Sequence, residues 1–159
     1  MNSAYLLLGS NMGNSQEKLL TAIKNIEDNI GTVKRRSGIY RTAAWGNTNQ
    51  PDFLNQVIIT ETKFTVVEIL HEILAIEKKM GRIRTIKNAP RIIDIDILFF
   101  NREIISAKHL TIPHPEIPNR RFVLVPLNEL SPNLKHPVLN KSIHRLLDEC
   151  SDPLDVKKF

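Results

Sequence analysis

The sequence predicts an α+β sandwich, an antiparallel sheet with helices packed on it, from the order of its elements. Apolar runs of strand length alternate with amphipathic helical stretches, giving strand–helix–strand and then strand–helix–strand before residue 101. Two such units in succession are typical of the ferredoxin-like sandwich, with its helices on one face of the sheet. No linker or composition break divides the 159 residues, so we expect a single domain over residues 1–159.

The first unit covers residues 5–41. Residues 5–8 predict a short apolar strand, which a turn at 9–13 ends. Asn14 is suited to cap a helix with Glu17 in the capping-box position, and Gly31 is suited to end it. An apolar stripe at helical spacing joins these ends: Leu19, Leu20, Ile23, Ile26 and Ile30. Residues 32–41 predict the second strand, although the basic run at 34–36 interrupts its pattern.

The second unit follows a polar loop over residues 42–52 and starts with a strand over 53–62. Thr65 and Glu68 form a capping box for the next helix, which Gly81 ends. A cationic loop leads into a strand over 89–100, and residues 101–105 predict a turn and a short strand that complete a hairpin. Seven of the nine prolines lie beyond residue 112, so we expect a partly irregular C-terminal third with helices near 119–128 and 141–149.

Composition narrows the classes of function. A net charge of +5 favours anionic partners, either nucleotides or nucleic acid. No signal pattern and no apolar run near 18 residues is present, so we expect neither secretion by that route nor a membrane span. Cys150 is the only cysteine, which excludes an intramolecular disulfide and a cysteine-based zinc cluster and fits a reducing cytoplasm.

The strand over 89–100 carries the chemistry. Side chains on a strand alternate between its faces, so Ile93, Ile95, Ile97 and Phe99 are expected on the core face. Asp94 and Asp96 then share the other face with Ile92, Leu98 and Phe100, with their carboxylates about 6.5–7 Å apart. A hard divalent cation such as Mg²⁺ relieves the repulsion between two such groups and accepts substrate phosphates as further ligands.

A solvated surface is the simpler reading of an isolated Asp-x-Asp pattern. The apolar residues on the same face argue against it, and so does the preceding loop. That loop contains Arg82, Arg84, Lys87 and Arg91 and no acidic residue. Guanidinium groups match phosphate oxygens well, so we interpret Arg82 and Arg84 as a phosphate clamp and place Arg91 at the strand entrance beside them.

Two further groups are candidates for the site. His114 lies between two prolines, which fix its direction, and an imidazole can donate a hydrogen bond to a phosphate. Phe53 and Asn55 share one face of their strand, and an aromatic ring beside an amide suits a flat heterocycle. Burial in the core is the default alternative for Phe53, Trp45 and Phe122.

At this point the residues match a family across positions 4–147. The matching segments, in order, are residues 5–11 with Gly-Ser-Asn, 40–42, 50–55, 77–84, Pro90-Arg91-x-x-Asp94-x-Asp96, Pro113-His114 and Asn119-Arg120-x-Phe122. Together they resemble the 6-hydroxymethyl-7,8-dihydropterin pyrophosphokinases of the folate pathway. The Pro-Arg-x-x-Asp-x-Asp segment is the most specific of them.

The resemblance implies transfer of the β,γ-diphosphoryl group of ATP to the pterin hydroxymethyl group, with release of AMP. It implies two Mg²⁺ ions on Asp94 and Asp96, with Arg82 and Arg91 catalytic. ATP would contact Leu70, Glu77, Arg82, Arg84, Arg91, Thr111 and His114. The pterin would stack between Phe53 and Phe122, with Thr42, Ala43, Trp45, Asn55 and Asp94 around it. Loops near 10–15, 43–52 and 82–91 would close over the substrates.

Two other classes remain to be weighed against this one. The fold and basic charge permit an RNA-binding module, but the carboxylate pair would repel a phosphate backbone unless metal were bound, and the RNP1-type run of glycine and aromatic residues is missing. A metal-dependent phosphohydrolase or nuclease could also use the Asp-x-Asp pattern. We therefore expect a monomeric cytoplasmic enzyme that acts on small molecules and binds neither nucleic acid nor membranes, with either Asp96 or the metal activating the pterin hydroxyl.

Overall fold

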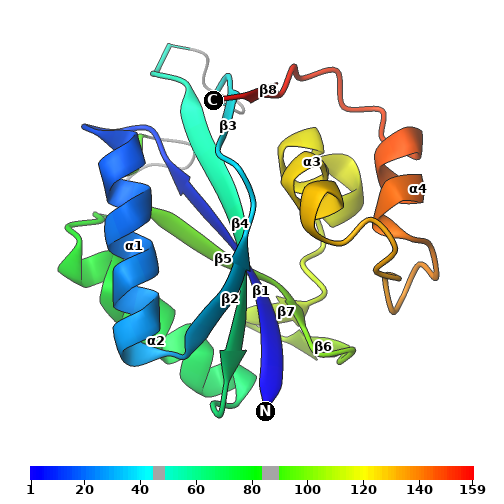
Figure 1. Cartoon of the computed structure of the whole chain (residues 1–159), viewed down its shortest axis with the longest axis horizontal. Coiled ribbons are helices and arrows are strands. Elements are labelled where there is room, and N and C mark those ends of the chain that lie inside the picture. The colour runs from blue at the N-terminus through cyan, green and yellow to red at the C-terminus, as the bar shows by residue number, and fades with distance from the viewer. Residues whose placement is uncertain (45–48, 84–89) are drawn as a thin grey trace.

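The computed structural model (Figure 1) describes residues 1–44, 49–83 and 90–159. One antiparallel sheet runs through it in the order β5-β1-β4-β3-β8, and β2 also pairs with β4. Its strands are β1 (Asn2–Ser10), β2 (Thr32–Arg36), β3 (Tyr40–Thr42), β4 (Phe53–Thr62), β5 (Asp94–Phe100) and β8 (Lys157–Lys158). The other elements are α1 (Ser15–Asn29), α2 (Val66–Lys79), the hairpin of β6 (Ile105–Ala107) and β7 (Leu110–Ile112), the 3₁₀ turn η1 (Ile117–Asn119), α3 (Arg121–Leu130) and α4 (Ile143–Glu149).

The helices form a layer on each face of the sheet, as Figure 1 shows with α1 and α2 on one side and α3 and α4 on the other. The first core joins Leu6, Leu8 and Ile58 of the sheet to the buried faces of α1 and α2. The second core joins Leu7 and Val57 to α3 and α4. The predicted ferredoxin-like sandwich is confirmed. The prediction that helices cover only one face of the sheet was wrong, because α3 and α4 of the C-terminal third cover the second face.

The helix ends follow the predicted chemistry closely. The Asn14 side chain accepts a hydrogen bond from the Glu17 N–H, and Thr65 and Glu68 complete their capping box. Gly81 follows α2 with a φ of +94°, as expected for a terminating glycine. Leu20, however, is 53 % exposed, so the apolar stripe of α1 is narrower than predicted.

The alternation along β5 changes at Leu98. Ile93, Ile95 and Ile97 belong to the first core as predicted, but Phe99 lies in the second core and Phe100 in the first. The pairing of β1 with β5 shifts register here, with Tyr5 opposite Phe99 and Leu6 opposite Ile97. A bulge inserts one residue and reverses the parity of those that follow, so the predicted faces of Phe99 and Phe100 were wrong. Ile92 also packs on the first core instead of beside the aspartates.

Three other predicted elements differ from the structure. The strand over 32–41 is two strands, because at Ser37 the chain leaves the β2 pairing and the Ser37 hydroxyl accepts the Val57 N–H. The strand over 89–100 begins only at Asp94. The hairpin partner of the short strand after residue 101 is β7 and not β5, since Asn101 turns the chain with a φ of +50°.

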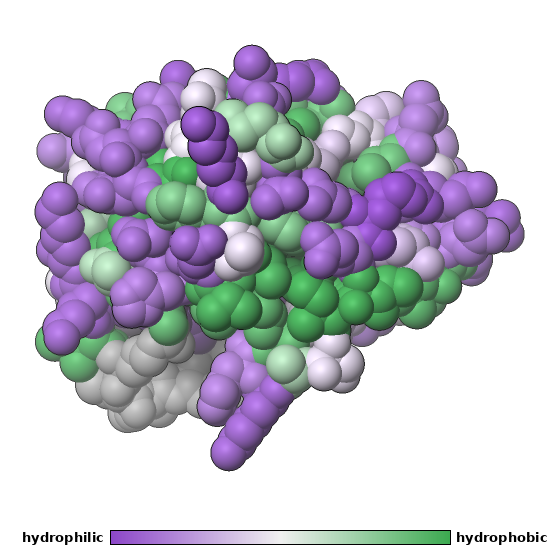
Figure 2. Space-filling model, turned by 90° about the horizontal axis from the view of Figure 1, so that it is seen from below, coloured by the Kyte–Doolittle hydropathy of each residue, from purple (hydrophilic) through white to green (hydrophobic). Residues whose placement is uncertain are grey.

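The surface is mainly hydrophilic. Figure 2 shows charged and polar residues over most of the face seen from below, interrupted by a band of apolar residues. Among the described residues, no helix has the length and apolarity needed to cross a membrane.

Candidate active site

A cleft of about 240 Å³ opens between the sheet and the start of α3. It lies where β1 ends and β4 and β5 begin, so several strands contribute side chains at one edge. The lining residues are Leu7, Gly9, Thr42, Ala43, Phe53, Asn55, Arg91, Asp94, Asp96, Leu98, His114, Arg120, Phe122 and Val123. Nine predicted site residues are therefore brought together from segments far apart in the sequence.

Strand register sets the spacing inside the cleft. Gly9 of β1 lies opposite Asn55 of β4 on one side and opposite Asp94 of β5 on the other. Neighbouring strands lie about 4.8 Å apart, so the backbones of Asn55 and Asp94 are about 10 Å apart across Gly9. The amide and the carboxylate thus occupy opposite ends of the cleft.

Acids and arginines form the charged end of the cleft (Glu77, Arg82, Arg91, Asp94 and Asp96). One Arg82 NH group lies 2.6 Å from Glu77 Oε2 and 2.8 Å from Asp94 Oδ1. Arg91 donates to the other oxygen, Asp94 Oδ2, at 3.0 Å. Glu77 Oε2 also accepts the Ile95 N–H at 2.9 Å, which fixes the end of α2 against β5. Both Asp94 oxygens are therefore already bound by guanidinium groups.

Asp96 differs from Asp94 in its surroundings. The structure records no hydrogen bond to its carboxylate from any residue that it describes. Burial, together with the charges of Asp94 and Glu77, raises the pKa of Asp96 to about 7, although Arg82 and Arg91 oppose the shift. The carboxylate therefore lies in an environment that favours added positive charge.

The donor set fits a magnesium site completed by a substrate. Within residues 1–44, 49–83 and 90–159, no three His, Cys, Asp or Glu side chains gather as a metal-binding group. A pair of carboxylates is nevertheless what Mg²⁺ uses when phosphate oxygens and water fill its other positions. Asp94 and Asp96 are on the same face of β5 and both line the cleft.

His114 is held in one orientation beside the charged end. Its backbone N–H donates to Leu98 O at 3.0 Å, and its Nδ1 accepts the Glu116 N–H at 3.1 Å. Burial and the charge of Arg120 lower its pKa, with Glu116 and Asp94 opposing. The neutral ring therefore carries its proton on Nε2, where it can donate to an anion.

Flat and polar side chains form the aromatic end of the cleft (Thr42, Phe53, Asn55 and Phe122). Thr42 is paired with Phe53 across β3 and β4, and Asn55 Nδ2 lies 3.4 Å from Thr42 Oγ1. Asn55 is only 4 % exposed, and it lines the cleft, so a polar group that enters the cleft can meet its amide. Phe122 contributes from the first turn of α3, beneath the Arg120 guanidinium at 5.9 Å from its ring centre.

Four of the other predicted site residues are described by the structure but do not line the cleft: Leu70, Glu77, Arg82 and Thr111. Glu77 and Arg82 do not line the cleft themselves, but Arg82 forms an ion pair with the lining residue Asp94 and another with Glu77. Leu70 packs on the first core, and Thr111 is exposed on β7 opposite Ser106. Trp45 and Arg84 lie outside the described residues.

Sequence reasoning missed three residues at the site. Gly9 lies close to Asn55, because a Cβ at this position would lie 2.9 Å from Asn55 Oδ1 and would require the amide to shift. Arg120 lines the cleft, although only its place in a motif was noted. Buried Asn11 accepts the Arg91 N–H at 2.8 Å and donates to Gln50 Oε1 at 2.7 Å, so it joins the segments before β4 and β5. The Gly-Ser-Asn turn was the available signal for Gly9 and Asn11.

Comparison with known proteins shows the family to which the chain is similar. The model of the 7,8-dihydro-6-hydroxymethylpterin-pyrophosphokinase (HPPK) family matches residues 5–132. A 2-amino-4-hydroxy-6-hydroxymethyldihydropteridine pyrophosphokinase of Aquifex aeolicus is 39% identical over 149 residues, which cover 94% of this chain and 92% of that protein. The folic acid synthesis protein fol1 of Pneumocystis carinii is 37% identical over 150 residues, but the match covers only 20% of its length.

Solved structures support the fold. The crystal structure of Plasmodium falciparum HPPK-DHPS, wild type with SDX-DHP, superposes with a TM-score of 0.76 at 22% identity. The similarity covers 94% of this chain and 43% of that one. With the family match and the relatives of nearly equal length, the chain belongs to the 7,8-dihydro-6-hydroxymethylpterin-pyrophosphokinase family and is a pyrophosphokinase of folate biosynthesis.

Proposed function

We propose that the cleft catalyses a Mg²⁺-dependent transfer of the diphosphoryl group of ATP to 6-hydroxymethyl-7,8-dihydropterin. The hydroxymethyl oxygen bonds to the β-phosphorus, the bond from that phosphorus to the α–β bridging oxygen breaks, and AMP leaves while the hydroxyl proton is released. One observation carries the proposal. A single cleft holds a carboxylate pair with two arginines at one end and an aromatic pair with a buried amide at the other.

Asp94 and Asp96 would hold two Mg²⁺ ions, and ATP phosphates would complete their coordination. When bound, these ions supply positive charge to the transferred group and lower the pKa of a coordinated hydroxyl. The carboxylate chemistry supports the assignment, because both oxygens of Asp94 already bind cations and Asp96 has a raised pKa.

The protein's own groups position the reactants. Arg82, Arg91 and His114 Nε2 would bind phosphate oxygens, and the guanidinium groups would neutralise the charge that builds up during transfer. Phe53 and Phe122 would hold the pterin ring, while Asn55, Thr42 and Ala43 would bind its polar edge. Phosphoryl transfer depends mostly on such positioning and charge stabilisation. Asp94, which is proposed to contact both a metal ion and the pterin, would align the hydroxymethyl group with the phosphates.

The nucleotide would extend beyond the described cleft. Leu70, Glu77, Arg84 and Thr111 remain proposed ATP contacts, and Trp45 a proposed pterin contact. Single alanine substitutions at Leu70 and Thr111 test the first group, since each should raise KM for ATP and leave KM for the pterin unchanged.

The deciding assay mixes the purified chain with MgATP and the reduced pterin alcohol and identifies the products. We expect AMP and the pterin diphosphate in equal amounts, and no reaction when excess EDTA removes the metal. ADP or free phosphate as the product would indicate a kinase or a phosphohydrolase instead. Binding to single-stranded RNA without turnover of the pterin would favour the nucleic-acid-binding module.

We also propose that the chain acts as one domain and as a monomer in the cytoplasm. Both cores lie on the two faces of a single sheet, which supports one folding unit. Cys150 is a free thiol, as expected in a reducing compartment. Sedimentation measurements across a range of concentrations test the monomer, and a single melting transition tests the one domain.

A further inference from the structure

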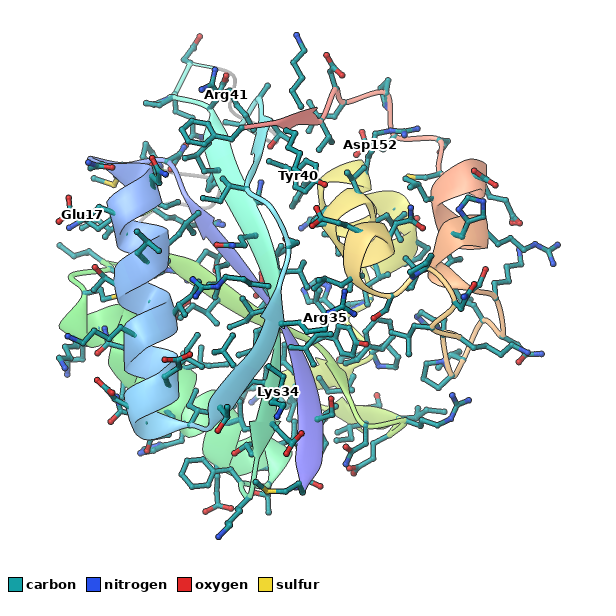
Figure 3. All side chains as sticks on the ribbon, viewed as in Figure 1. Glu17, Lys34, Arg35, Tyr40, Arg41 and Asp152 are labelled. Carbon is teal, nitrogen blue, oxygen red and sulfur yellow. The ribbon has the colours of Figure 1, made fainter. Side chains whose placement is uncertain are left out.

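The last residues of the chain contact both walls of the aromatic end, although they lie beyond the segment that the family model matches. Figure 3 shows this C-terminal tail (residues 151–159) crossing from α4 to β3, with Asp152 near α3 and Tyr40 and Arg41 at β3. Neither the proposed binding of ATP nor the proposed pterin contacts involve the tail. Its contacts therefore need a separate explanation.

At α3 the tail supplies a helix cap that the helix lacks. Arg120 is the N-cap residue, and its side chain makes no capping bond. Instead, Asp152 Oδ2 accepts the Arg121 N–H at 3.0 Å, and the Asp152 backbone oxygen accepts Arg121 Nε at 3.3 Å. A carboxylate at this position satisfies a free backbone donor and complements the helix dipole. Asp152 is only 6 % exposed, and its Oδ1 accepts the Leu154 N–H, so its orientation is fixed.

This cap lies next to the cleft. The capped turn of α3 carries Arg120, Phe122 and Val123, all of which line the cleft. Fraying of that turn would move Phe122, the side chain proposed to stack on one face of the pterin. The Asp152 cap therefore lies on the same helical turn as this side chain.

At β3 the tail adds a strand to the sheet. β8 pairs with β3 through Lys157 opposite Arg41 and Lys158 opposite Tyr40, and the Phe159 N–H donates to Ile39 O at 2.8 Å. The Arg41 guanidinium lies 5.2 Å from the centre of the Phe159 ring. Without β8, β3 would be a three-residue edge strand, paired with β4 alone and with unpaired backbone groups along its other side. Thr42 and Ala43, at the end of β3, line the cleft.

A third set of contacts joins the two walls. Glu129 of α3 accepts hydrogen bonds from Tyr40 OH at 2.5 Å and from the Gly38 N–H, and Lys158 Nζ lies 3.7 Å from the same carboxylate. The tail thus bonds to α3 at its first turn and to β3 along its length, while Glu129 fixes α3 to β3 between them.

We propose that residues 151–159 set the width of the pterin-binding end of the cleft by bracing β3 and α3 against each other, with Asp152 and Phe159 as positioning residues. The inference rests on the proposed pterin site. We expect the tail to affect pterin recognition and not ATP recognition. Asp94 and Asp96 belong to β5, and Arg82 and Arg91 are held by ion pairs with residues of β5 and α2.

The experiment uses four variants of the full chain. Asp152→Ala removes the cap, whereas Asp152→Asn keeps an acceptor oxygen in its place. Phe159→Pro removes the N–H that donates to Ile39 and tests the β3 contact separately. Asp155→Ala is the matched control, since it removes from the same tail an exposed carboxylate that forms an ion pair with the exposed Lys157. KM for the pterin, KM for ATP, kcat and the melting temperature are measured for each.

For Asp152→Ala we expect a pterin KM raised by about tenfold, because a wall displaced by a fraction of an ångström loosens the fit. KM for ATP should stay within about twofold, and Asp152→Asn should restore most of the pterin affinity. Phe159→Pro should shift the same constant in the same direction, and Asp155→Ala should match the parent chain.

Equal rises in both KM values, or a lower melting temperature with unchanged KM values, would show that the tail only stabilises the fold and would overturn the inference. If Asp152→Ala does not fold, Phe159→Pro decides by the same criteria. The parent chain separates this failure from that of the proposed function. If the parent makes AMP, and Phe53→Ala loses pterin affinity while the tail variants do not, then only the brace is wrong.

Discussion

At the charged end of the cleft the side chains bind one another, whereas at the aromatic end they are held by the register of the sheet. Arg82 and Arg91 already occupy both oxygens of Asp94, so phosphates and metal must compete with existing ion pairs. Thr42, Phe53 and Asn55 stand on β3 and β4, whose backbone pairing holds them without any ligand. We infer that the aromatic end is preformed, and that the charged end exchanges its partners when the phosphates arrive.

The largest effect is expected at Asp96. Asp96→Ala should lower kcat by about a thousandfold, because metal binding contributes several kcal/mol and each 1.4 kcal/mol is a factor of ten. The melting temperature should not fall, since the change removes repulsion from Asp94 and Glu77. Asp94→Ala is the contrasting variant, because it also deprives Arg82 and Arg91 of their partner and should be less stable. Substantial turnover by Asp96→Ala at saturating Mg²⁺ would remove the metal assignment.

Arg82 tests whether the ion pairs exchange. Arg82→Ala should lower kcat by about a hundredfold and raise KM for ATP much less, if the arginine engages mainly as charge develops. Arg82→Lys keeps the positive charge but lacks the several N–H donors of a guanidinium group. Compared with Arg82→Ala, it should therefore restore more of the melting temperature than of kcat. Melting curves and steady-state kinetics measure both. A rise in KM alone would make Arg82 a ground-state ligand of ATP.

Phe53 tests the preformed end. Phe53→Ala should weaken pterin binding by about tenfold, since an aromatic contact is worth about 0.5–1.5 kcal/mol beyond the area it buries. Separate titrations with a pterin analogue and with MgATP should show the loss for the pterin only. A large drop in melting temperature with equal losses for both ligands would instead place Phe53 among the core residues.

Gly9 gives a smaller and more specific test. Gly9→Ala should weaken pterin binding severalfold, because the new Cβ would approach Asn55 Oδ1 to 2.9 Å and displace the amide. The same change made in an Asn55→Ala background should have little further effect, since the displaced group is gone. Additive losses would show that Gly9 acts through the backbone of β1. Gly31→Ala is the control, because its Cβ would meet the Glu61 backbone oxygen at 2.2 Å and lower stability without selecting between ligands.

The smallest effect concerns pH. The pKa of His114 is lowered in the folded state by burial and by Arg120, so the unfolded chain binds a proton first as the pH falls. His114 therefore favours the folded state above its unfolded pKa, near 6.5, and this contribution is lost as the pH falls toward the folded value. The free energy of unfolding should decrease less between pH 7.5 and 5.5 in His114→Gln than in the parent chain. Denaturant curves measure this free energy at each pH, and an equal decrease in the variant and the parent chain would contradict the assignment.

The sequence predicted the local structure better than the register. Capping residues and helical spacing located α1 and α2, and strand alternation placed Asp94 and Asp96 on one face. Alternation failed after Leu98, because a bulge depends on how β1 pairs with β5 and leaves no mark in the sequence of β5. The predicted pairing of β6 with β5 was wrong for a similar reason, because tertiary contacts decide which strands pair, and β6 pairs with β7.

The candidate site was predicted where a motif carried the chemistry and missed where geometry did. Asp94, Arg91 and His114 have side chains that suggest their proposed roles, whereas Gly9 is placed at the site by its position opposite Asn55. Gly31 ends α1 as expected, yet it is needed for the close backbone of Glu61 and not for a left-handed turn. The proposed brace by residues 151–159 depends on contacts with β3, more than a hundred residues earlier in the chain, and with α3, and no local pattern reveals either set.

Because Gly9 lies between Asn55 and Asp94, the spacing of the strands fixes the distance between the two ends of the cleft. Two strand spacings separate the group proposed to bind the ring from the group proposed to hold the metals, and backbone hydrogen bonds fix that length. Side-chain substitutions can change which substrate groups bind at either end of the cleft, but they cannot lengthen the distance between the backbones of Asn55 and Asp94. A pterin with a reactive oxygen one bond further from the ring would therefore place that oxygen beyond the proposed metal positions. We infer that the backbone of β1 makes the site specific for the length of the hydroxyalkyl group on the pterin.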